Sequence, residues 1–455
     1  MRFAIRTFGC QMNVYDSDRI RDILMAAGMD PAGTGDAIPG DVEACCDVFI
    51  LNTCSVREKP RQKVVSAISR ARAANPGVTV VVTGCVAQLE PETLVGIGAD
   101  VVVGPDHYAE LPELLGLNLE RGTETVPRRT DVVRITGADE VPSFLMASPE
   151  TMSERGAVSC FVPIQKGCDN WCAFCVVPAA RGREVTRPEH EILEECRRFL
   201  DAGARELFLL GQNVNSVRLP GGFPGLLEQV AALPGLLRVR FTTSHPRDCS
   251  PELARAMARL PRVMPWLHLP VQSGSSRILA AMGRRYTREH YLELIDLFRR
   301  EVPGIAFTTD VIVGFPGETE DDFEDTVDLV QKVGFEGMYS FMYSPRPGTR
   351  AATLPDPVPQ EVAASRLSRL QGLHEAQVPR LLERYRDLAV EVLVEGPSAR
   401  DPRHASGRNP QNVVVNFEVA EGVEVASLRG RVVSVLILEV RTHTLFGRMI
   451  ASEKA

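Results

Sequence analysis

The chain has 455 residues, of which 44% are hydrophobic and 24% are charged, and 51 basic against 59 acidic residues give a formal charge of −8. This composition is typical of a globular protein and excludes a largely disordered, collagen-like or coiled-coil chain, while the negative charge excludes a protein that is basic over its whole surface. A local RNA-binding surface stays compatible with it. No apolar run approaches the roughly 18 residues of a membrane helix, and the N-terminus lacks the apolar segment of a signal peptide. We therefore expect a cytoplasmic protein without membrane contact, built from about three domains.

The first predicted domain, residues 1–117, alternates strands with helices such as the one expected over 59–73. This alternation is typical of a doubly wound α/β domain with a parallel sheet. Its strands are expected at 3–8, 48–53, 79–84 and 101–104. Residues 118–155 show no sustained period and are predicted to be a linker.

Residues 156–381 repeat a strand followed by a helix six times. Such a series predicts a six-unit (β/α) partial TIM barrel, with its chemistry at the C-terminal ends of the strands. The strands are expected at 161–165, 206–211, 237–242, 266–271, 306–313 and 337–343. Ser250 before a proline and Thr319 before three acidic residues are predicted to cap helices.

The last segment, residues 382–455, changes to short strands with no helical period between them. These strands are expected at 390–396, 413–417, 432–440 and 444–450. The pattern predicts a small all-β, OB-like barrel.

Eleven cysteines in a chain expected in the cytoplasm do not indicate a disulfide framework, because thiols stay reduced there. The sharpest pattern is GCDNWCAFC at 167–175, in which Cys168, Cys172 and Cys175 have C-x3-C-x2-C spacing. A loop with this spacing can hold three irons of a 4Fe-4S cluster and leaves the fourth iron open. The alternatives are chance spacing or a zinc site, although zinc prefers paired C-x2-C units. The loop follows the first barrel strand and resembles that of the radical S-adenosylmethionine (AdoMet) superfamily, in which the open iron binds AdoMet.

Three further cysteines, Cys10, Cys54 and Cys85, each lie within two residues of the end of a predicted strand. Because the carboxyl ends of parallel strands meet at one edge of a sheet, these thiols can converge. Each alone could be a buried thiol that only packs. Their surroundings, TFGCQMN, NTCSVRE and TGCVAQ, resemble the N-terminal domain of methylthiotransferases, whose three cysteines hold a second 4Fe-4S cluster.

The remaining cysteines fit no cluster pattern. Cys45 and Cys46 precede the strand that leads to Cys54, and we interpret them as structural, with a redox-active thiol or an alternative ligand as the other interpretation. Cys196 lies within a predicted helix and is expected in the core, and Cys160 and Cys249 carry no signal.

Longer phrases extend the resemblance over nearly the whole chain. They are VVPAARGRE (176–184), LGQNVNS (210–216), RFTTSHPRD (240–248), HLPVQSG (268–274), TDVIVGFPGETEDDF (309–323) and FMYSPRPGT (341–349). The chain thus resembles the methylthiotransferase family of radical AdoMet enzymes with a C-terminal TRAM domain, and TTSHP resembles its tRNA-modifying branch. The resemblance implies a transferase that places a methylthio group on adenine C2 of N6-dimethylallyladenosine at position 37, 3′ to the anticodon.

Three alternatives stay open beside this function. Two are the same chemistry on N6-threonylcarbamoyladenosine tRNA or on a ribosomal protein. The third is a non-catalytic iron–sulfur electron carrier or RNA-binding module, which both open-iron patterns and the full six-unit core disfavour.

The implied reaction explains why two 4Fe-4S clusters would serve one chain. The adenine C2–H bond is strong, so its cleavage needs a carbon radical made from AdoMet, whereas the second cluster serves the sulfur donation. In the family one AdoMet supplies the methyl group and another the radical, and the protein positions these cofactors. The implied partners are tRNA carrying N6-dimethylallyladenosine, a small electron donor of the flavodoxin or ferredoxin type and a sulfur donor. We expect a monomer.

Polar side chains at or near the ends of the barrel strands are candidates for contacts to AdoMet. They are Gln212, Asn213, Thr242, Ser244, Gln272 and Asp310, of which Asp310 lies inside its predicted strand. For each, a hydrogen bond that only caps its loop is the alternative.

Candidates for substrate contacts are His245 and two groups of arginines. His245 could be a base or a substrate contact, or could only order its loop. Arg181 and Arg183 follow the cluster loop and could hold a carboxylate or phosphate, or form surface salt bridges. Arg400, Arg403 and Arg408 are placed together in one loop of the last domain and are the phosphate candidates there, against a solvated loop. Family members usually carry Asn-Arg before VVNF, whereas here Val413 follows Asn412.

Overall fold

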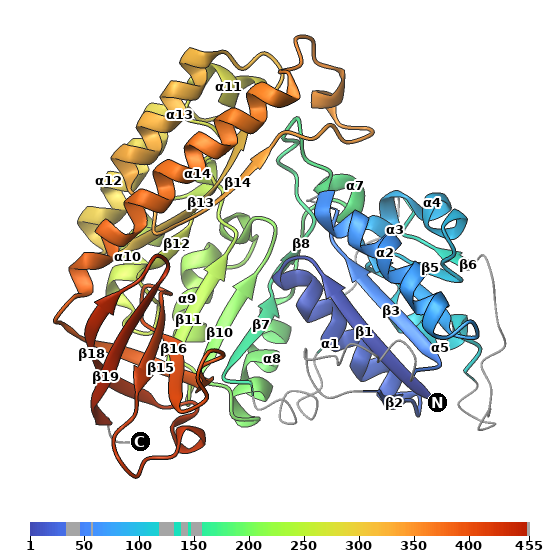
Figure 1. Ribbon diagram of the computed structural model, residues 1–455, viewed down its shortest axis with the longest axis horizontal. Helices are drawn as coiled ribbons and strands as arrows, with labels where there is room; N and C mark the ends of the chain where they lie inside the picture. Colours follow the sequence, from blue (N-terminus) through green and yellow to red (C-terminus); the bar gives the residue numbers. More distant parts are fainter. Residues whose placement is uncertain (33–45, 56–57, 118–131, 138–143, 147–156, 453–455) are drawn as a thin grey trace.

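The computed structural model describes residues 1–32, 46–55, 58–117, 132–137, 144–146 and 157–452. Figure 1 shows three bodies: an N-terminal α/β domain, a central array of strands and helices, and a C-terminal barrel of strands. The predicted fold class is confirmed in all three. Within the described residues, no helix combines the length and the apolar character needed to cross a bilayer.

The N-terminal domain is a parallel sheet in the order β2-β1-β3-β4-β5-β6. Four strands match the prediction closely: β1 (Arg2–Phe8), β3 (Val48–Thr53), β4 (Thr79–Gly84) and β5 (Val101–Val103). Apolar side chains from both faces of the sheet enter separate cores beneath α1 (Gln11–Ala26) and α2 (Glu58–Ala74). Burial on both faces explains why these strands are near-continuous runs of Val, Ile and Leu.

Two short strands were not predicted. β2 (Asp30–Pro31) adds to one edge of the sheet, and β6 (Val132–Arg134) pairs with β5 at the other edge. β6 falls inside the predicted linker, so this segment completes the N-terminal sheet as well as connecting domains.

The central domain has the six predicted parallel strands. They are β7 (Ser159–Pro163), β10 (Glu206–Leu210), β11 (Arg238–Thr242), β12 (Trp266–His268), β13 (Ala306–Val313) and β14 (Gly337–Met342). They form two three-stranded sheets, β11-β10-β7 and β12-β13-β14, joined by a parallel bridge between Val239 and Val263. The result is a partial barrel, open between its two edge strands.

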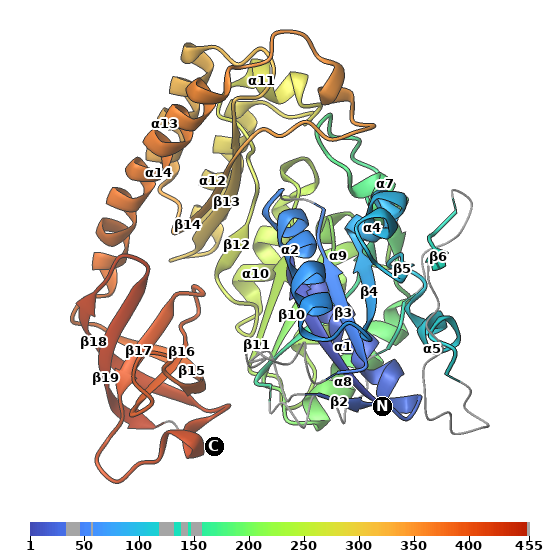
Figure 2. The ribbon, with the colours of Figure 1, turned by 45° about the vertical axis from the view of Figure 1, so that its right-hand side comes forward.

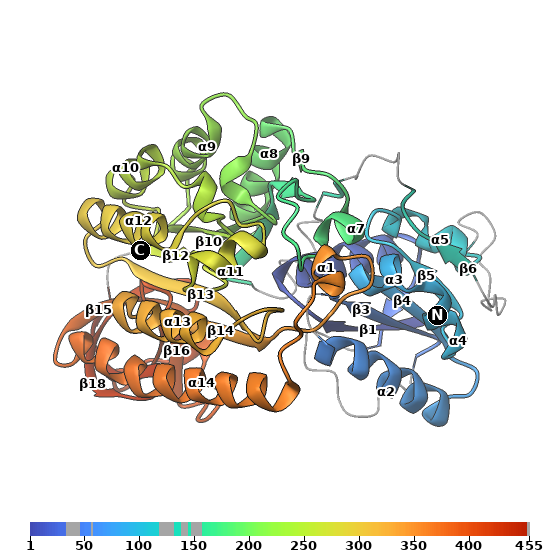
Figure 3. The ribbon, with the colours of Figure 1, turned by 90° about the horizontal axis from the view of Figure 1, so that it is seen from above.

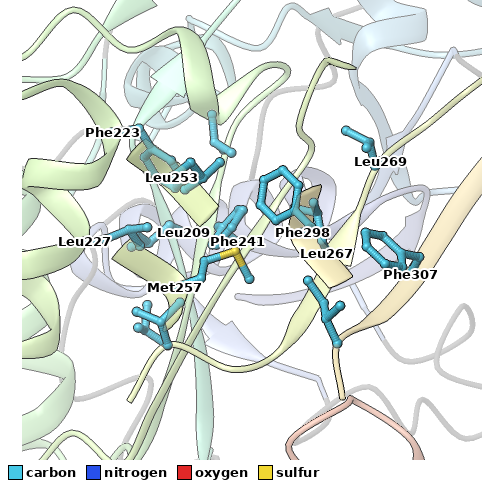
Figure 4. Packing of buried hydrophobic residues seen from close by; sticks show 14 of the residues in the cluster. Leu209, Phe223, Leu227, Phe241, Leu253, Met257, Leu267, Leu269, Phe298 and Phe307 are labelled. Atoms are coloured by element: carbon cyan, nitrogen blue, oxygen red, sulfur yellow. The ribbon is translucent and has the colours of Figure 1, made fainter. Parts of the chain in front are cut away.

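Helices cover the outside of this partial barrel. They are α8 (Glu189–Asp201), α9 (Gly222–Ala231), α10 (Pro251–Arg259), α11 (Ser276–Ala281), α12 (Arg288–Glu301), α13 (Glu320–Val333) and α14 (Gln360–Leu382). Their apolar faces meet the strands in the core shown in Figure 4, where Phe223 packs edge-on against Phe241. Both predicted caps are confirmed, since Ser250 accepts from Leu253 and Thr319 forms a capping box with Asp322.

The N-terminal domain lies against the strand side of the partial barrel (Figures 1 and 3). Met12 of α1 packs with Phe208, Leu210, Trp266 and Ala306 from the barrel strands. The side chain two residues after Cys10 therefore fills part of the barrel interior, which brings the end of β1 close to the strands.

The C-terminal barrel is closed, in the order β15-β16-β17-β19-β18. Its strands, shown in Figure 2, are β15 (Ala389–Pro397), β16 (His404–Arg408), β17 (Val414–Glu418), β18 (Val432–Val440) and β19 (Thr444–Ser452). β16 was not predicted, because HASGR is small and polar and lacks the signature of a strand. Placing the three phosphate-candidate arginines in one loop was therefore wrong, since Arg408 belongs to β16.

Two arginines of β11 attach this barrel to the central domain. Arg238 donates to the Arg408 carbonyl at 2.6 Å, and Arg240 donates to the carbonyls of Asn409 and Pro410 at 2.8 and 2.7 Å. Arg240 is fully buried and also pairs with Glu206 at 2.8 Å. Backbone oxygens of the C-terminal barrel thus complete the hydrogen bonding of buried guanidinium groups.

Candidate functional site

The loop with the C-x3-C-x2-C pattern leaves the barrel as a closed excursion after β7. The antiparallel pair β8 (Gln165–Lys166) and β9 (Val185–Thr186) forms its base, and the short helix α7 (Val177–Arg181) follows the last cysteine. Gly167 has a φ of +71°, and a Cβ there would lie 2.0 Å from the Arg183 carbonyl oxygen. Glycine is therefore required where the two ends of the excursion touch.

Cys168, Cys172 and Cys175 are all partly exposed in this loop. The Val177 N–H donates to Cys175 Sγ at 3.4 Å, and Arg284 Nη1 donates to Cys172 Sγ at 3.3 Å. Desolvation raises the pKa of Cys175 to about 12. Donors aimed at sulfur and a nearby cation suit a negatively charged thiolate cluster, so these residues fit a 4Fe-4S cluster.

Cys10, Cys54 and Cys85 also come together, as expected, at the carboxyl edge of the N-terminal sheet. Phe8, Thr53 and Gly84 are register partners at the ends of β1, β3 and β4, and each cysteine follows within two residues. Cys10 caps α1 and Cys85 begins α3 (Cys85–Leu89). The side chains of Cys10 and Cys54 interact through a hydrogen bond, which lowers the pKa of Cys10 to about 6.

Two glycines permit this close approach. A Cβ on Gly9 would lie 2.8 Å from Cys54 Cβ and 2.4 Å from Asn13 Oδ1. At Gly84, where φ is +90°, it would lie 2.5 Å from the Thr53 carbonyl oxygen. A side chain at Gly9 would displace Asn13 or Cys54, and one at Gly84 would displace the end of β3, which leads to Cys54.

Arg181 joins the two cysteine groups. Its guanidinium, only 3% exposed, donates to Cys85 Sγ at 3.2 Å and to Asp16 Oδ2 at 2.6 Å. Arg181 is thus buried and paired with the chain's own Asp16 rather than held in a surface salt bridge, and its contact with a substrate stays a prediction.

No three His, Cys, Asp or Glu side chains among the described residues are arranged to hold a single metal ion. A cubane cluster differs from an ion because each cysteine binds a separate iron, so its ligands stand further apart. The fit of both cysteine groups to a cluster therefore rests on three thiols at one site with donors directed at sulfur.

Of the remaining cysteines, Cys196 was expected in the core and is buried there. Cys46 lies in the core of the N-terminal sheet, whereas Cys45 lies outside the described residues. Cys160 and Cys196 are buried in the barrel core. Cys249 accepts a hydrogen bond from Asn215 at 3.2 Å.

Three of the predicted AdoMet contacts, Gln212, Asn213 and Ser244, lie just beyond the carboxyl ends of β10 and β11. The backbone N–H groups of Gln212 and Asn213 donate to Gln165 Oε1 at 2.8 and 3.2 Å, which shapes their loop. Gln212 Oε1, Asn213 Oδ1 and Ser244 Oγ are buried with no hydrogen-bond partner among the described residues. Buried polar atoms are normally satisfied, so these three oxygens fit a polar ligand bound beside the cysteine loop.

The other three predicted contacts are arranged differently. The Thr242 hydroxyl shares a hydrogen bond with that of Thr243, and Gln272, with a φ of +72°, donates its N–H to the Asp310 carbonyl. Asp310 lies inside β13, where its carboxylate is 3.7 Å from His268 Nε2.

His245 is buried and caps the short helix that follows it. Its Nδ1 accepts from the Arg247 N–H at 3.2 Å. Burial, together with the charges of Arg284 and Arg247, lowers the pKa of His245 to about 2. The geometry favours the loop-ordering role over that of a base, and a substrate contact stays a prediction.

Three of the other candidate arginines are paired with acids. Arg183 contacts Asp169 at 2.9 Å, Arg403 contacts Asp401 at 2.8 Å, and Arg408 contacts Glu395 at 3.1 Å. Arg183, Arg400 and Arg403 are exposed, whereas Arg408 is half-buried. Ion pairs at exposed positions are weak, and phosphate binding by these arginines stays a prediction.

Sequence reasoning missed Arg284 and His268. Arg284 lies between two helices, 112 residues from the cysteine it contacts, and no local pattern marks it. His268 begins the quoted phrase HLPVQSG, but its contact with Thr308, at 2.9 Å, depends on the pairing of β12 with β13.

Comparison with known proteins agrees with this geometry. Residues 162–330 match the Radical SAM superfamily, residues 2–104 the Uncharacterized protein family UPF0004, and residues 384–450 the TRAM domain. In fold, the chain is similar to the radical S-adenosylmethionine methyltransferase TsrM from Kitasatospora setae, with a TM-score of 0.56, 17% identity and 77% of each chain covered.

Whole-length relatives are much more similar in sequence. Proteins named tRNA-2-methylthio-N(6)-dimethylallyladenosine synthase from Nitratidesulfovibrio vulgaris and Moorella thermoacetica are each 42% identical, covering 97% and 98% of both chains. A protein of the same name from Sorangium cellulosum is 42% identical over 100% of this chain and 94% of its own. At this identity over nearly its whole length, the chain belongs to the tRNA-2-methylthio-N(6)-dimethylallyladenosine synthase family of radical AdoMet enzymes.

Proposed function

We propose that the chain is a tRNA methylthiotransferase that converts N6-dimethylallyladenosine at position 37 into 2-methylthio-N6-dimethylallyladenosine. The observation that carries this function is the pair of three-cysteine groups, one at the barrel and one at the N-terminal sheet, connected through Arg181. The names of relatives that are 42% identical support the same substrate. An electron carrier would not need the six-stranded partial barrel with unpartnered polar oxygens near its strand ends.

Each group of residues has a separate task in this proposal. Cys168, Cys172 and Cys175 hold a 4Fe-4S cluster, which together with AdoMet supplies the carbon radical needed to remove the C2 hydrogen. The unpartnered oxygens of Gln212, Asn213 and Ser244 bind polar groups of AdoMet beside that loop. Thr242, Gln272 and Asp310 are further candidates along the same strands.

The second group serves the transfer of sulfur. Cys10, Cys54 and Cys85 hold the second 4Fe-4S cluster in this proposal. Met12, packed among barrel side chains, keeps the end of β1 against the barrel and limits the entry of water there.

Several partners and boundaries are part of the proposal. A small electron-donor protein and a sulfur donor serve a monomeric, cytoplasmic enzyme, and Arg183, Arg400, Arg403 and Arg408 contact tRNA phosphates. The functional units are residues 1–117 with the strand β6 from the connecting segment 118–155, the radical AdoMet core 156–381 and the TRAM domain 382–455.

The test is an anaerobic reaction of the reconstituted protein with AdoMet, a reductant and tRNA, followed by nucleoside mass spectrometry. Two tRNA pools are used, one carrying N6-dimethylallyladenosine and one carrying N6-threonylcarbamoyladenosine. The proposal expects the methylthio group only on the first nucleoside. A methylthio group only on the second, or AdoMet cleavage with neither nucleoside changed, would contradict the proposed substrate.

A further inference from the structure

Arg181 ends the short helix α7 of the central domain, but its two closest polar contacts lie in the N-terminal domain. Nε donates to Cys85 Sγ at 3.2 Å and Nη2 donates to Asp16 Oδ2 at 2.6 Å. Cys85 begins α3 and Asp16 lies in α1, and all three side chains are buried. The loop that carries one cysteine group is therefore tied directly to a cysteine of the other.

The Nε and Nη2 groups of Arg181 donate to two different acceptors. Nε and one terminal nitrogen form a rigid planar fork that commonly takes both oxygens of one carboxylate. Here one branch takes Asp16 and the other takes the sulfur of Cys85. Asp16 is fixed in turn by the Tyr108 hydroxyl at 3.1 Å. The Cys85 sulfur thus accepts from a buried guanidinium that is itself held by Asp16.

One nitrogen of the same guanidinium is unused. Arg181 Nη1 is buried and has no hydrogen-bond partner among the described residues. A buried charged donor that lacks a partner is costly, so it indicates a group that binds beside the cysteines. A sulfur-rich anion at Cys10, Cys54 and Cys85 would accept from it.

We propose that Arg181 is a positioning residue of the second cluster, which fixes the Cys85 thiolate and stabilises the reduced cluster through its N–H···S hydrogen bond and its charge. This inference rests on the proposed function, because it requires a cluster at the N-terminal cysteines. One-electron reduction makes a cluster more negative, and the net charge and the hydrogen bonds to its sulfurs set its reduction potential. Arg181 therefore raises that potential, and the Asp16 carboxylate beside it lowers it.

The other cysteine group has a related contact with a different charge balance. Arg284 donates to Cys172 at 3.3 Å, but its remaining donors go to the neutral Pro270 carbonyl and the Tyr286 hydroxyl. Arg181 instead has a carboxylate partner. The two sites are thus built alike in their hydrogen bond to sulfur and differ in their counter-charge.

The test uses the full chain with Cys168, Cys172 and Cys175 all changed to Ala, so that only the second cluster is reconstituted. Iron content, the EPR spectrum after reduction with dithionite and the midpoint potential are measured in this background. Arg181→Met is expected to lower the midpoint, so that the reduced-to-oxidised ratio at the original midpoint falls about tenfold, or about 59 mV for one electron. Asp16→Asn is expected to shift it the opposite way, and Arg218→Met, on an arginine that is 74% exposed, to leave it unchanged.

Opposite shifts distinguish an electrostatic role from a structural one. If Arg181 only held the fold, both variants would lower iron content while the potential of the remaining cluster stayed the same, and this result would overturn the inference. Shifts in the same direction would also overturn it. If the chain with Cys168, Cys172 and Cys175 changed to Ala but with Arg181 intact binds no iron, the proposed second cluster itself is wrong.

A further variant covers the case in which Arg181→Met fails to fold. This substitution leaves Asp16 buried without its cation, which is strongly destabilising. Arg181→Met combined with Asp16→Asn removes both charges at once, and its midpoint is compared with that of Asp16→Asn alone. The inference expects the double variant to have the lower potential, and equal values would contradict it.

Discussion

Arg284 Nη1 donates a hydrogen bond to Cys172 Sγ at 3.3 Å, although the two residues are 112 positions apart in sequence. Arg284 lies between α11 and α12. It donates to the Tyr286 hydroxyl at 3.0 Å and to the Pro270 carbonyl at 3.1 Å. The second half of the barrel therefore supplies the cation for a cysteine loop that belongs to the first half.

We predict that Arg284→Met slows AdoMet cleavage. Loss of the N–H···S bond and of the charge makes the cluster at Cys172 harder to reduce, because both stabilise its reduced form. The expected result is at least a roughly tenfold lower rate of 5′-deoxyadenosine formation, equal to about 1.4 kcal/mol in activation free energy. Arg285→Met, on the exposed neighbour, is the control. Equal rates for the two variants would show that the contact has no role in cluster reduction.

Gly9→Ala is predicted to remove the second cluster while the first stays. A Cβ at this position lies 2.8 Å from Cys54 Cβ, so Cys10 and Cys54 must separate. Iron bound per chain is expected to fall by about half, because each cluster contains four irons. Gly96→Ala, in α4 (Pro91–Gly96), is the control, since nothing lies within 4 Å of its added methyl group. Full iron content in Gly9→Ala would argue against cluster binding by these cysteines.

Arg240→Met is predicted to destabilise the protein and to loosen the C-terminal barrel. It leaves Glu206 buried without its cation and the carbonyls of Asn409 and Pro410 without donors. Breaking a buried pair in this way costs about 3–5 kcal/mol. Urea unfolding measures this cost, and limited proteolysis at the barrel junction reports the loosening. Arg240→Met with Glu206→Gln should recover part of the stability, and failure to do so would mean that the ion pair is not the cause.

The pH dependence of stability is predicted to include a contribution from His245. Its pKa is about 2 in the folded protein, lowered by burial, against about 6.5 when unfolded. Below pH 6.5 the unfolded chain therefore takes up a proton that the folded protein does not. As the pH decreases through this range, the free energy of unfolding decreases by up to about 1.4 kcal/mol per pH unit. His245→Asn keeps an acceptor for the cap but does not titrate. Its unfolding free energy, measured between pH 5.5 and 8, should change less than that of the parent, and parallel curves would contradict the assignment.

The parts of the fold that could be predicted are those with a dense local pattern. β3, β4, β13 and β18 are apolar runs with clear ends, and each was predicted to the residue. β6 was missed because it is only three residues long and lies inside a polar segment, and β16 was missed because it is a run of small and polar residues. Each becomes a strand only by pairing with its neighbour, β5 or β17.

The same distinction applies to the site. The two cysteine groups could be predicted because their spacing along the chain, or their place after strands, is visible in the sequence. The role of Arg181 could not, because its partners Asp16 and Cys85 lie 165 and 96 residues away and meet it only when two domains pack. The sequence does not distinguish an arginine that is exposed after the cluster loop, as Arg183 is, from one that is buried there, as Arg181 is.

The most direct measurement follows two products of one anaerobic reaction, 5′-deoxyadenosine and the methylthiolated nucleoside, in four proteins. The parent chain should form both. Cys168→Ala should form neither, whereas Cys54→Ala should form 5′-deoxyadenosine but no methylthiolated nucleoside, with Cys196→Ala in the core of α8 as the cysteine control. Full methylthiolation by Cys54→Ala would contradict the division of work between the two cysteine groups.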